Sequence, residues 1–261
     1  MSIITTGDIP SLLRPGLEKV GLEYAMYKGE YNKVYETRKS MKYEEVLQEM
    51  RYTGYAQEVA QGAAIPISSM GAAYKYQFIH MTFGLGFIIT KIAIDDNQYK
   101  SQFNTNARAL YDSYEQTKEV MALNMFNQAF NPAVIIGDGQ PLCSQNHPIY
   151  GGVFSNTFPA LVDFSETGVE QMIIRVSKFK NQAGLLIKAA VEALLIPTNL
   201  EFSGCRLLES TFRINTANND INAIYNMKAI PKGYISNPFL TSPTNWFGLT
   251  NVKGTRLHFE R

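Results

Sequence analysis

Residues 74–90 read YKYQFIHMTFGLGFIIT, and this stretch carries the pattern that decides the fold. Its first aromatic side chains alternate with polar ones, which is the period of a half-buried strand: Tyr74, Tyr76 and Phe78. After residue 78 the apolar side chains shift to odd positions, so the buried face changes along the run. One unbroken strand of this length would measure about 55 Å, more than the diameter of a small domain. We therefore predict a strand that leaves the body of the subunit or bends, with Gly84 and Gly86 as the bend points.

A second strand is expected upstream, so that residues 41–90 form a long two-stranded hairpin. Between the strands, residues 61–71 read QGAAIPISSMG, and such small residues with glycines and a proline are typical of a loop tip. An isolated hairpin is only marginally stable in water, so this one needs a surface to lie on. We expect that surface to belong to a neighbouring copy of the chain, through these contact residues: Tyr52, Tyr55, Ile65, Pro66, Ile67, Tyr74 and Tyr76.

The strongest helical pattern covers residues 95–131. Asp95 and Asp96 suit the positive end of a helix, and the Asn131-Pro132 pair is expected to end it. Such a helix would be about 54 Å long. Its apolar residues recur every three or four positions and form a single stripe: Tyr99, Phe103, Ala107, Leu110, Tyr114, Thr117, Met121 and Met125.

The remaining elements mix helices and strands, which predicts an α+β fold. Residues 1–40 contain several prolines and glycines and are expected to form an arm without a core of its own. Ser165 should cap a helix, and the capping-box spacing of residues 198–201 predicts another helix to about Ser210. Three further segments are predicted to be strands, the first of them buried on both faces: residues 185–196, 227–235 and 246–259.

Composition favours a chain with large interfaces. Charged residues make up 18% of the chain, against roughly 25% in a typical soluble domain. The net charge of +1 gives no reason to expect a reader of nucleic acid. The N-terminus shows no secretion signal, and no apolar run is long enough to span a bilayer. The two cysteines imply no disulfide framework, so we expect the protein to be made in a reducing cytoplasm.

No residues stand out as catalytic, cofactor-binding or metal-binding. His80, His147 and His258 are scattered, and a lone histidine in a strand is usually structural. Cys143 and His147 are four positions apart, but two ligands do not complete a metal site. The Gly-Leu-Gly run at residues 84–86 lacks the third glycine of a dinucleotide-binding loop. We therefore expect a protein that is not an enzyme and that needs no cofactor.

Short motifs along nearly the whole chain resemble the Mu-like major head subunit family of tailed bacteriophages, whose capsid proteins have the Hong Kong 97-type fold. The N-terminal motifs are ITTGDIP at residues 4–10 and LEKV at residues 17–20. The later ones follow in order: LGFIIT at 85–90 with Asp95, Asp96 and Tyr99, FNQAFN at 126–131, Asp138-Gly139, Pro141-Leu142, His147-Pro148, NDIN at 219–222 and Trp246-Phe247.

This resemblance implies an architecture in five parts: an N-terminal arm at 1–40, an extended hairpin loop at 41–90, a peripheral domain with a spine helix at 91–135, an axial domain at 136–226, and returning strands of the peripheral domain at 227–261. The family's chains are expected to continue beyond Arg261. Deletion of residues 57–72 should leave soluble subunits but block the formation of shells.

The resemblance also implies a function. Copies of the chain would form hexamers and pentamers and close into an icosahedral head shell around phage DNA. The protein would lie in the virion capsid and would be assembled in the host cytoplasm. Its partners would be further copies of itself with scaffold, portal and decoration proteins; it would touch DNA only non-specifically and would bind no membrane. The alternatives are an encapsulin-like nanocompartment shell and, from another class, a cytoplasmic enzyme without a recognisable motif.

Overall fold

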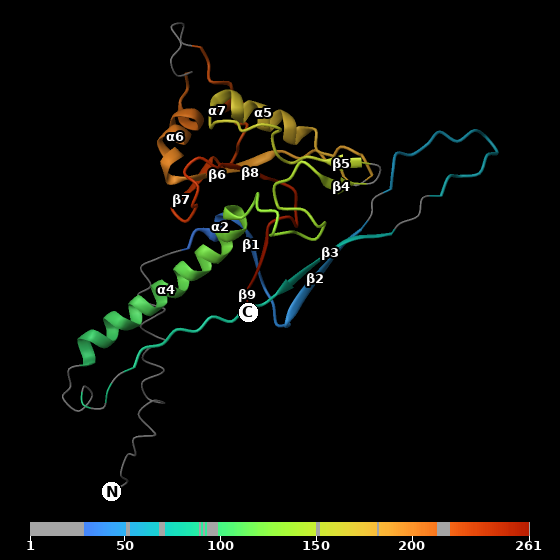
Figure 1. Ribbon diagram of the computed structural model, residues 1–261. Coiled ribbons are helices and arrows are strands. Elements are labelled where there is room, and N and C mark those ends of the chain that lie inside the picture. Colours follow the sequence, from blue (N-terminus) through green and yellow to red (C-terminus); the bar gives the residue numbers. More distant parts are fainter. Residues whose placement is uncertain are drawn as a thin grey trace. The chain divides into compact units, whose positions relative to one another are not determined.

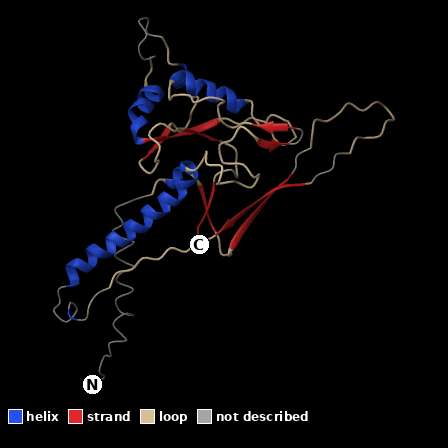
Figure 2. Cartoon of the chain, in the orientation of Figure 1, coloured by secondary structure: helices blue, strands red, loops and turns tan. Residues whose placement is uncertain are grey.

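The chain forms two compact units: residues Met1–Tyr31 with Met81–Ala122, and residues Asn32–His80 with Leu123–Arg261. The computed structural model shows α-helices and β-strands interspersed along the chain (Figure 2). This mixed content agrees with the predicted α+β class. It describes residues 29–260 except for the following positions: 51–52, 68–70, 89, 91, 93–98, 150–151, 182 and 213–219.

A three-stranded sheet is the centre of the second unit (Figure 1). Its middle strand β6 (Val191–Pro197) pairs in parallel with β7 (Tyr234–Asn237) and antiparallel with β8 (Phe247–Thr250). Leu194 of β6 packs into one apolar cluster with helices α5 (Glu166–Ser177), α6 (Glu201–Glu209) and α7 (Ala223–Asn226). The neighbouring Leu195 packs into a second cluster with Val34, Leu123 and Phe126. The expected strand buried on both faces is therefore confirmed, although it begins at Val191.

The sequence predicted the N-terminal cap of α5 correctly but not that of α6. Ser165 caps α5, where its hydroxyl oxygen accepts a hydrogen bond of 3.2 Å from the backbone N–H of Gly168. Helix α6 also exists, but the predicted capping box is wrong. Thr198 lies in a 3₁₀ turn (Thr198–Leu200) that leads straight out of β6, whereas a capping residue needs an extended backbone.

The long helix is confirmed as α4 (Tyr99–Asn127), while Asp95 and Asp96 lie outside the described residues. It ends four residues before the predicted Asn131, where the chain turns and the backbone N–H of Ala129 bonds to the carbonyl of Phe126, only three residues back. The Asn127 amide donates a hydrogen bond of 3.0 Å to the carbonyl of Phe239 and accepts one of 3.0 Å from the backbone N–H of Thr241. In the first unit, the buried carboxylate of Glu119 accepts hydrogen bonds from the backbone N–H groups of residues 30 and 31.

The predicted hairpin forms, but it is shorter than expected. Strands β2 (Glu44–Met50) and β3 (Ala72–Ile79) pair antiparallel. The expectation that the strand continues to Thr90 is wrong, because the described residues 81–88 form no strand and belong to the first unit. There the backbone N–H and carbonyl of Leu85 both bond to the hydroxyl of Tyr114 on α4, at 2.9 Å each. Among the described residues, the side chain of Tyr114 on a helix, rather than a second strand, bonds to this segment.

The C-terminal part also departs from the predicted strands. The segment 227–235 contributes to a strand only from residue 234, because the chain turns at two residues with positive φ, Lys228 at 48° and Gly233 at 65°. The segment 246–259 forms two strands, β8 and β9 (Leu257–Glu260), with a turn between them. Strand β9 pairs in parallel with β1 (Glu36–Lys39), which follows the short helix α2 (Tyr31–Val34). The two ends of the described chain are thus joined in one small sheet.

Arg256 fastens the N-terminal and C-terminal segments to the central sheet. Its guanidinium donates hydrogen bonds to the carbonyls of Val34 at 3.1 Å and Thr250 at 3.0 Å, and to the Glu192 carboxylate at 2.5 Å. Glu192 also accepts an ion-pair contact of 2.6 Å from Lys232. The hydrogen bonds from Lys232 and then from Arg256 hold the pKa of Glu192 below its ordinary value. This network links residues that are far apart in the sequence.

Replacing Arg256 with alanine should lower the free energy of unfolding by about 2 kcal/mol, because the change removes three charge-assisted hydrogen bonds, to two backbone carbonyls and one carboxylate. Urea unfolding of the purified chain measures this loss. The matched control is Arg38→Ala, which removes an arginine whose ion pair with Glu36 is exposed; its cost should stay within about 0.5 kcal/mol. Equal costs for the two variants would contradict the role given to Arg256.

Candidate functional site

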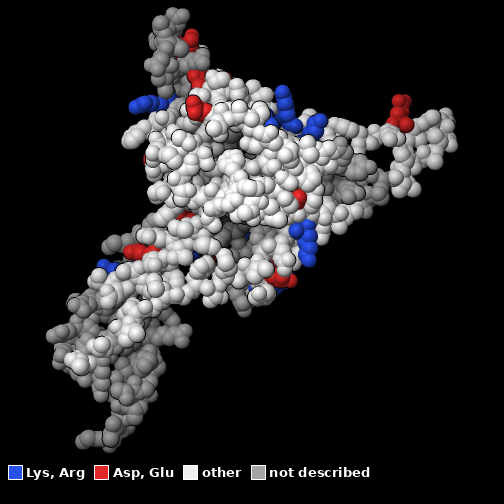
Figure 3. Space-filling view, viewed as in Figure 1, with Lys and Arg blue, Asp and Glu red and all other residues white. Residues whose placement is uncertain are grey.

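The loop between β2 and β3 is exposed and almost uncharged. Residues 53–67 contain one charged side chain, Glu58, and the loop ends in the apolar run Ile65-Pro66-Ile67. Ile65 is 78% exposed and Ile67 is 96% exposed. Figure 3 shows this loop as a mostly white projection with a single acidic group. A cluster of exposed apolar side chains on one segment is typical of an interaction surface.

The structure divides the predicted contact residues into two groups. Tyr55, Ile65, Pro66 and Ile67 lie exposed on the loop, whereas Tyr52 lies outside the described residues. Tyr74 and Tyr76 lie on β3, are half-buried and contact their own chain. The loop thus offers free apolar side chains, and the tyrosines of β3 belong to the place where the hairpin joins the rest of its unit. We call this place the hairpin root, and it comprises Glu49, Tyr74 and Tyr76 with residues 137–148.

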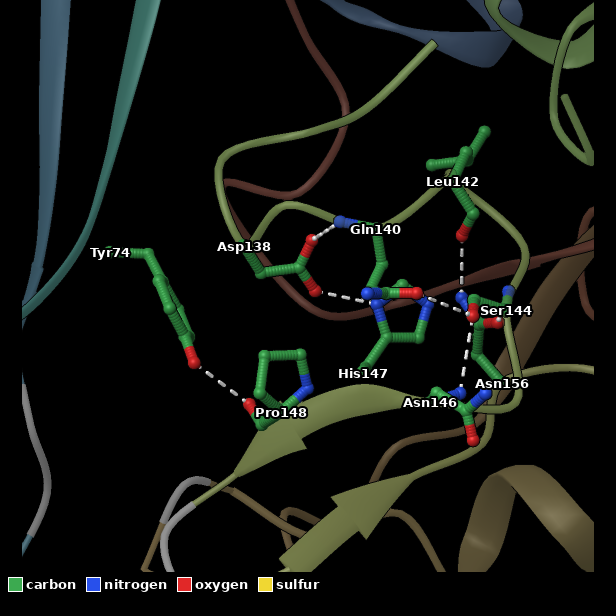
Figure 4. Close-up of polar contacts among 9 residues, drawn as sticks. All are labelled: Tyr74, Asp138, Gln140, Leu142, Ser144, Asn146, His147, Pro148 and Asn156. Carbon is green, nitrogen blue, oxygen red and sulfur yellow. Dashed lines mark hydrogen bonds and ion pairs between the residues drawn. The ribbon is translucent and has the colours of Figure 1, made fainter. Parts of the chain in front are cut away.

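Two tyrosines seat β3 at the hairpin root. The Tyr74 hydroxyl donates a hydrogen bond of 3.0 Å to the carbonyl of Pro148, in strand β4 (His147–Ile149), which pairs with β5 (Gly152–Phe154) (Figure 4). The Tyr76 ring lies directly against Gly137, where an added Cβ would come within 2.6 Å of the ring. Only glycine fits at position 137 without moving the tyrosine. The hairpin therefore joins the unit through close contacts.

A buried ion-pair contact shapes the loop that receives these tyrosines. Oδ2 of Asp138 lies 2.6 Å from Nδ1 of His147, and the two side chains are 8% and 10% exposed (Figure 4). The other oxygen, Oδ1, accepts a hydrogen bond of 3.0 Å from the backbone N–H of Gln140. Nε2 of His147 is buried and has no hydrogen-bond partner among the described residues. Since the carboxylate accepts, the Nδ1 atom of His147 carries the shared proton.

Acidic groups gather at the hairpin root. Burial and the negative charge of Asp138 raise the pKa of Glu49, a half-buried residue of β2. Burial, followed by the charges of Glu49 and Asp138, raises the pKa of the Tyr76 hydroxyl to about 12.

Cys143, His80 and His258 lie in or beside the core and the strands. Cys143 is half-buried beside the core, its backbone N–H bonds to the Ala129 carbonyl at 2.8 Å, and burial raises the pKa of its thiol to about 11. His80 follows β3 directly, and His258 lies in β9 opposite Thr37. Within the described part of the chain, no cluster of His, Cys, Asp or Glu has the arrangement of a metal site. Nor is any described helix both long and apolar enough to cross a bilayer.

Sequence reasoning missed the partnership of Asp138 and His147. The two residues are nine positions apart in a stretch rich in loops, where no periodic pattern reports which side chains meet. Both appear in the motifs that carry the family resemblance, but as separate dipeptides. The short separation of Asp138 and His147 in the sequence was a signal that could have suggested their contact.

No protein-family model and no curated protein sequence matches this chain. Solved structures do match. The capsid of bacteriophage JBD30 aligns with a TM-score of 0.64 and 14% identity, over 92% of this chain and 100% of that chain. The JBD30 capsid decorated with minor capsid protein trimers gives 0.63 and 15% over 92% and 100%. The JBD30 procapsid gives 0.61 and 14% over 91% and 100%. The chain therefore has the fold of a bacteriophage capsid protein.

Proposed function

We propose that this chain is the major capsid protein of a tailed bacteriophage and that its copies assemble into the icosahedral head shell around the phage DNA. The observation that carries this proposal is the extent of the fold match, which covers 92% of this chain and 100% of the JBD30 capsid chain. A match over both full lengths favours a common role more than a shared subdomain would. The motifs of the Mu-like head family favour the Hong Kong 97-type variety of this fold.

The exposed loop supplies a physical reason for assembly. Ile65 and Ile67 lie in water on a single chain, and burying such a side chain against a neighbour contributes about 1.5–3 kcal/mol. Each copy would give its loop to one neighbour and receive the loop of another. Such head-to-tail contacts close into rings, and the rings into a shell.

The expected division of the chain forms part of this proposal. Helix α4 would be the spine of the peripheral domain, and residues 227–261 would be the returning strands of that same domain. Residues 136–226 would form the axial domain. Residues 1–40 would serve as the arm and the β2–β3 hairpin with its loop as the extended loop. The axial domains of six or five copies would then meet around the symmetry axes of hexamers and pentamers.

Partners and location follow from the same role. One of the matching structures is decorated with minor capsid protein trimers, which supports a decoration protein as a partner of this shell. Scaffold and portal proteins would act during assembly in the host cytoplasm, and the finished protein would lie in the virion capsid. The near-neutral charge of the chain suits a wall that touches DNA only non-specifically.

Electron microscopy tests the proposal directly. The chain is expressed alone and together with candidate scaffold and portal proteins of the same phage, and the products are separated by size-exclusion chromatography. We expect closed shells, visible in negative stain and eluting at the void volume, in at least one of the two expressions. A monomer or a small oligomer in both would contradict the capsid role.

A further inference from the structure

Opposite charges are separated along the chain on the two sides of helix α5. The sequence contains no lysine or arginine from residue 119 to residue 174, and no aspartate or glutamate from residue 171 to residue 191. The acidic residues before and within α5 are Asp163, Glu166 and Glu170, and the basic residues that follow are Arg175, Lys178, Lys180 and Lys188. The helix dipole explains Glu166 and Arg175, which lie in the first and last turns. Its effect falls off within those turns, so it does not explain Glu170, Lys180 or Lys188.

The lysines after α5 lie on a tight turn of residues 178–188, which we call the basic turn. Its backbone is closed by an antiparallel bridge between Lys180 and Leu186. The ring of Phe179 packs edge-on against Phe154 of β5, with 4.9 Å between the ring centroids. The turn is therefore held by a backbone bridge and by an aromatic contact with its own unit, and it presents its remaining side chains to the solvent.

The basic turn offers exposed lysines together with exposed apolar side chains. Lys178, Lys180 and Lys188 are exposed, and none of them forms an ion pair among the described residues. Leu186 is 56% exposed and Ile187 is 37% exposed. Figure 3, in the view of Figure 1, shows basic side chains gathered over the region of α5. Nucleic acid is bound mainly through its phosphates, which aliphatic side chains do not match. The mixture favours an acidic protein surface as the partner.

A surface of complementary charge lies at the other end of α5, at residues 161–170, which we call the acidic end. Asp163 is exposed and Glu170 is half-buried, and neither has an ion pair in the part of the chain that the structure describes. Leu161, two residues before Asp163, is fully exposed. Within the described residues of one chain, no ion pair joins the acidic end to the basic turn. Both surfaces are thus available to other molecules.

We propose that the basic turn of one copy of the chain binds the acidic end of a second copy. The inference deepens the proposed function and rests on it, because it names a contact through which copies of the capsid protein would meet. The lysines of one copy face the carboxylates of the next, and Leu186 and Leu161 leave water at the same interface. Because two different surfaces of the chain are joined, the contact is head-to-tail, and such contacts can close into rings.

Charge reversal tests this contact through the yield of shells, measured by sedimentation and negative-stain microscopy. Lys180→Glu with Lys188→Glu sets carboxylates against carboxylates, so the yield should fall about tenfold. Asp163→Lys with Glu170→Lys sets ammonium groups against ammonium groups and should cause a similar loss. A chain with all four changes carries both surfaces with their charges exchanged, and its yield should return to within about twofold of the unchanged chain. Damage to folding cannot produce such a recovery.

Lys228→Glu with Lys253→Glu is the matched control for the lysine reversal. Both lysines are exposed and lie outside the basic turn. Lys228 also shares a positive φ with Lys188, 48° against 49°, so the control makes the same change of charge in the same backbone conformation. Its shells should form at the normal yield. A loss as large as that of the Lys180 and Lys188 variant would mean that net charge, and not this contact, controls assembly, and would overturn the proposal.

Crosslinking between copies gives a readout that does not require a closed shell. Unlabelled and heavy-isotope-labelled copies are mixed before assembly and treated with a carbodiimide, which joins lysine amines to carboxylates as amides. By mass spectrometry we expect peptides of the basic turn linked to peptides of the acidic end, with one partner of each isotope, which identifies two different copies. Such links in a small oligomer that forms no shells would support the contact and contradict the capsid role.

Two outcomes would overturn the inference and leave the capsid role intact. The first is shells of the unchanged chain that contain no mixed-isotope link between the basic turn and the acidic end. The second is a normal shell yield from the Lys180 and Lys188 variant; if those shells also retained less DNA, the basic turn would be assigned to nucleic acid instead. A chain whose copies do not associate at all would contradict both the contact and the capsid role.

Discussion

A chain that lacks residues 57–67 is expected to fold and stay soluble but to form no shells. The deletion removes Ile65 and Ile67, the exposed apolar side chains that a neighbouring copy would cover. It spares β2 and β3, whereas the wider deletion of residues 57–72 suggested by the sequence would cut into β3 at Ala72. The remaining linker is long enough to close the hairpin. Size-exclusion chromatography and negative-stain microscopy measure the loss of shells.

Two further measurements separate a failure to assemble from a failure to fold. Because the deleted side chains are exposed, the free energy of unfolding should change by no more than about 0.5 kcal/mol. The double variant Ile65→Asp with Ile67→Asp keeps the loop length and should also block assembly, whereas Glu58→Gln on the same loop should assemble normally. Regular shells from the deleted chain would remove the physical basis that we give for assembly.

The largest effect on stability is expected from Leu195→Ala. Leu195 is fully buried in the middle strand of the sheet and packs in one cluster with Leu123, Phe126 and Phe247. These neighbours come from α4 and β8, so the cavity has rigid walls on several sides and cannot collapse fully. The change should lower the free energy of unfolding by about 3–5 kcal/mol, as for other large-to-small changes in a rigid core. Urea unfolding of the unassembled chain measures it.

Leu161→Ala is the matched control for that measurement. It makes the same chemical change at a leucine that is fully exposed, and its effect should stay within about 0.5 kcal/mol. If Leu195→Ala cost no more than Leu161→Ala, the sheet flanked by two apolar clusters would not be the core that holds the second unit together.

Much of the local structure could be predicted because it depends on neighbours in the sequence. Ser165 caps α5 through a hydrogen bond that spans three residues. The continuous apolar run of β6 indicates burial on both faces, and the three-to-four periodicity of residues 99–125 indicates a long helix. The loop with Ile65 and Ile67 is exposed, and its role as a contact surface stays a prediction.

The sequence by itself determined most kinds of elements, their order and the apolar character of the loop at residues 53–67, because periodicity, capping and turn residues act over a few positions. Only the tertiary structure decided which elements meet. It ended β3 at Ile79, joined β1 to β9, and placed Asp138 against His147 beside the tyrosines of the hairpin. Such contacts join distant segments, and the packing free energy of the whole unit selects them. A pattern of neighbouring residues does not indicate which distant segments will be in contact.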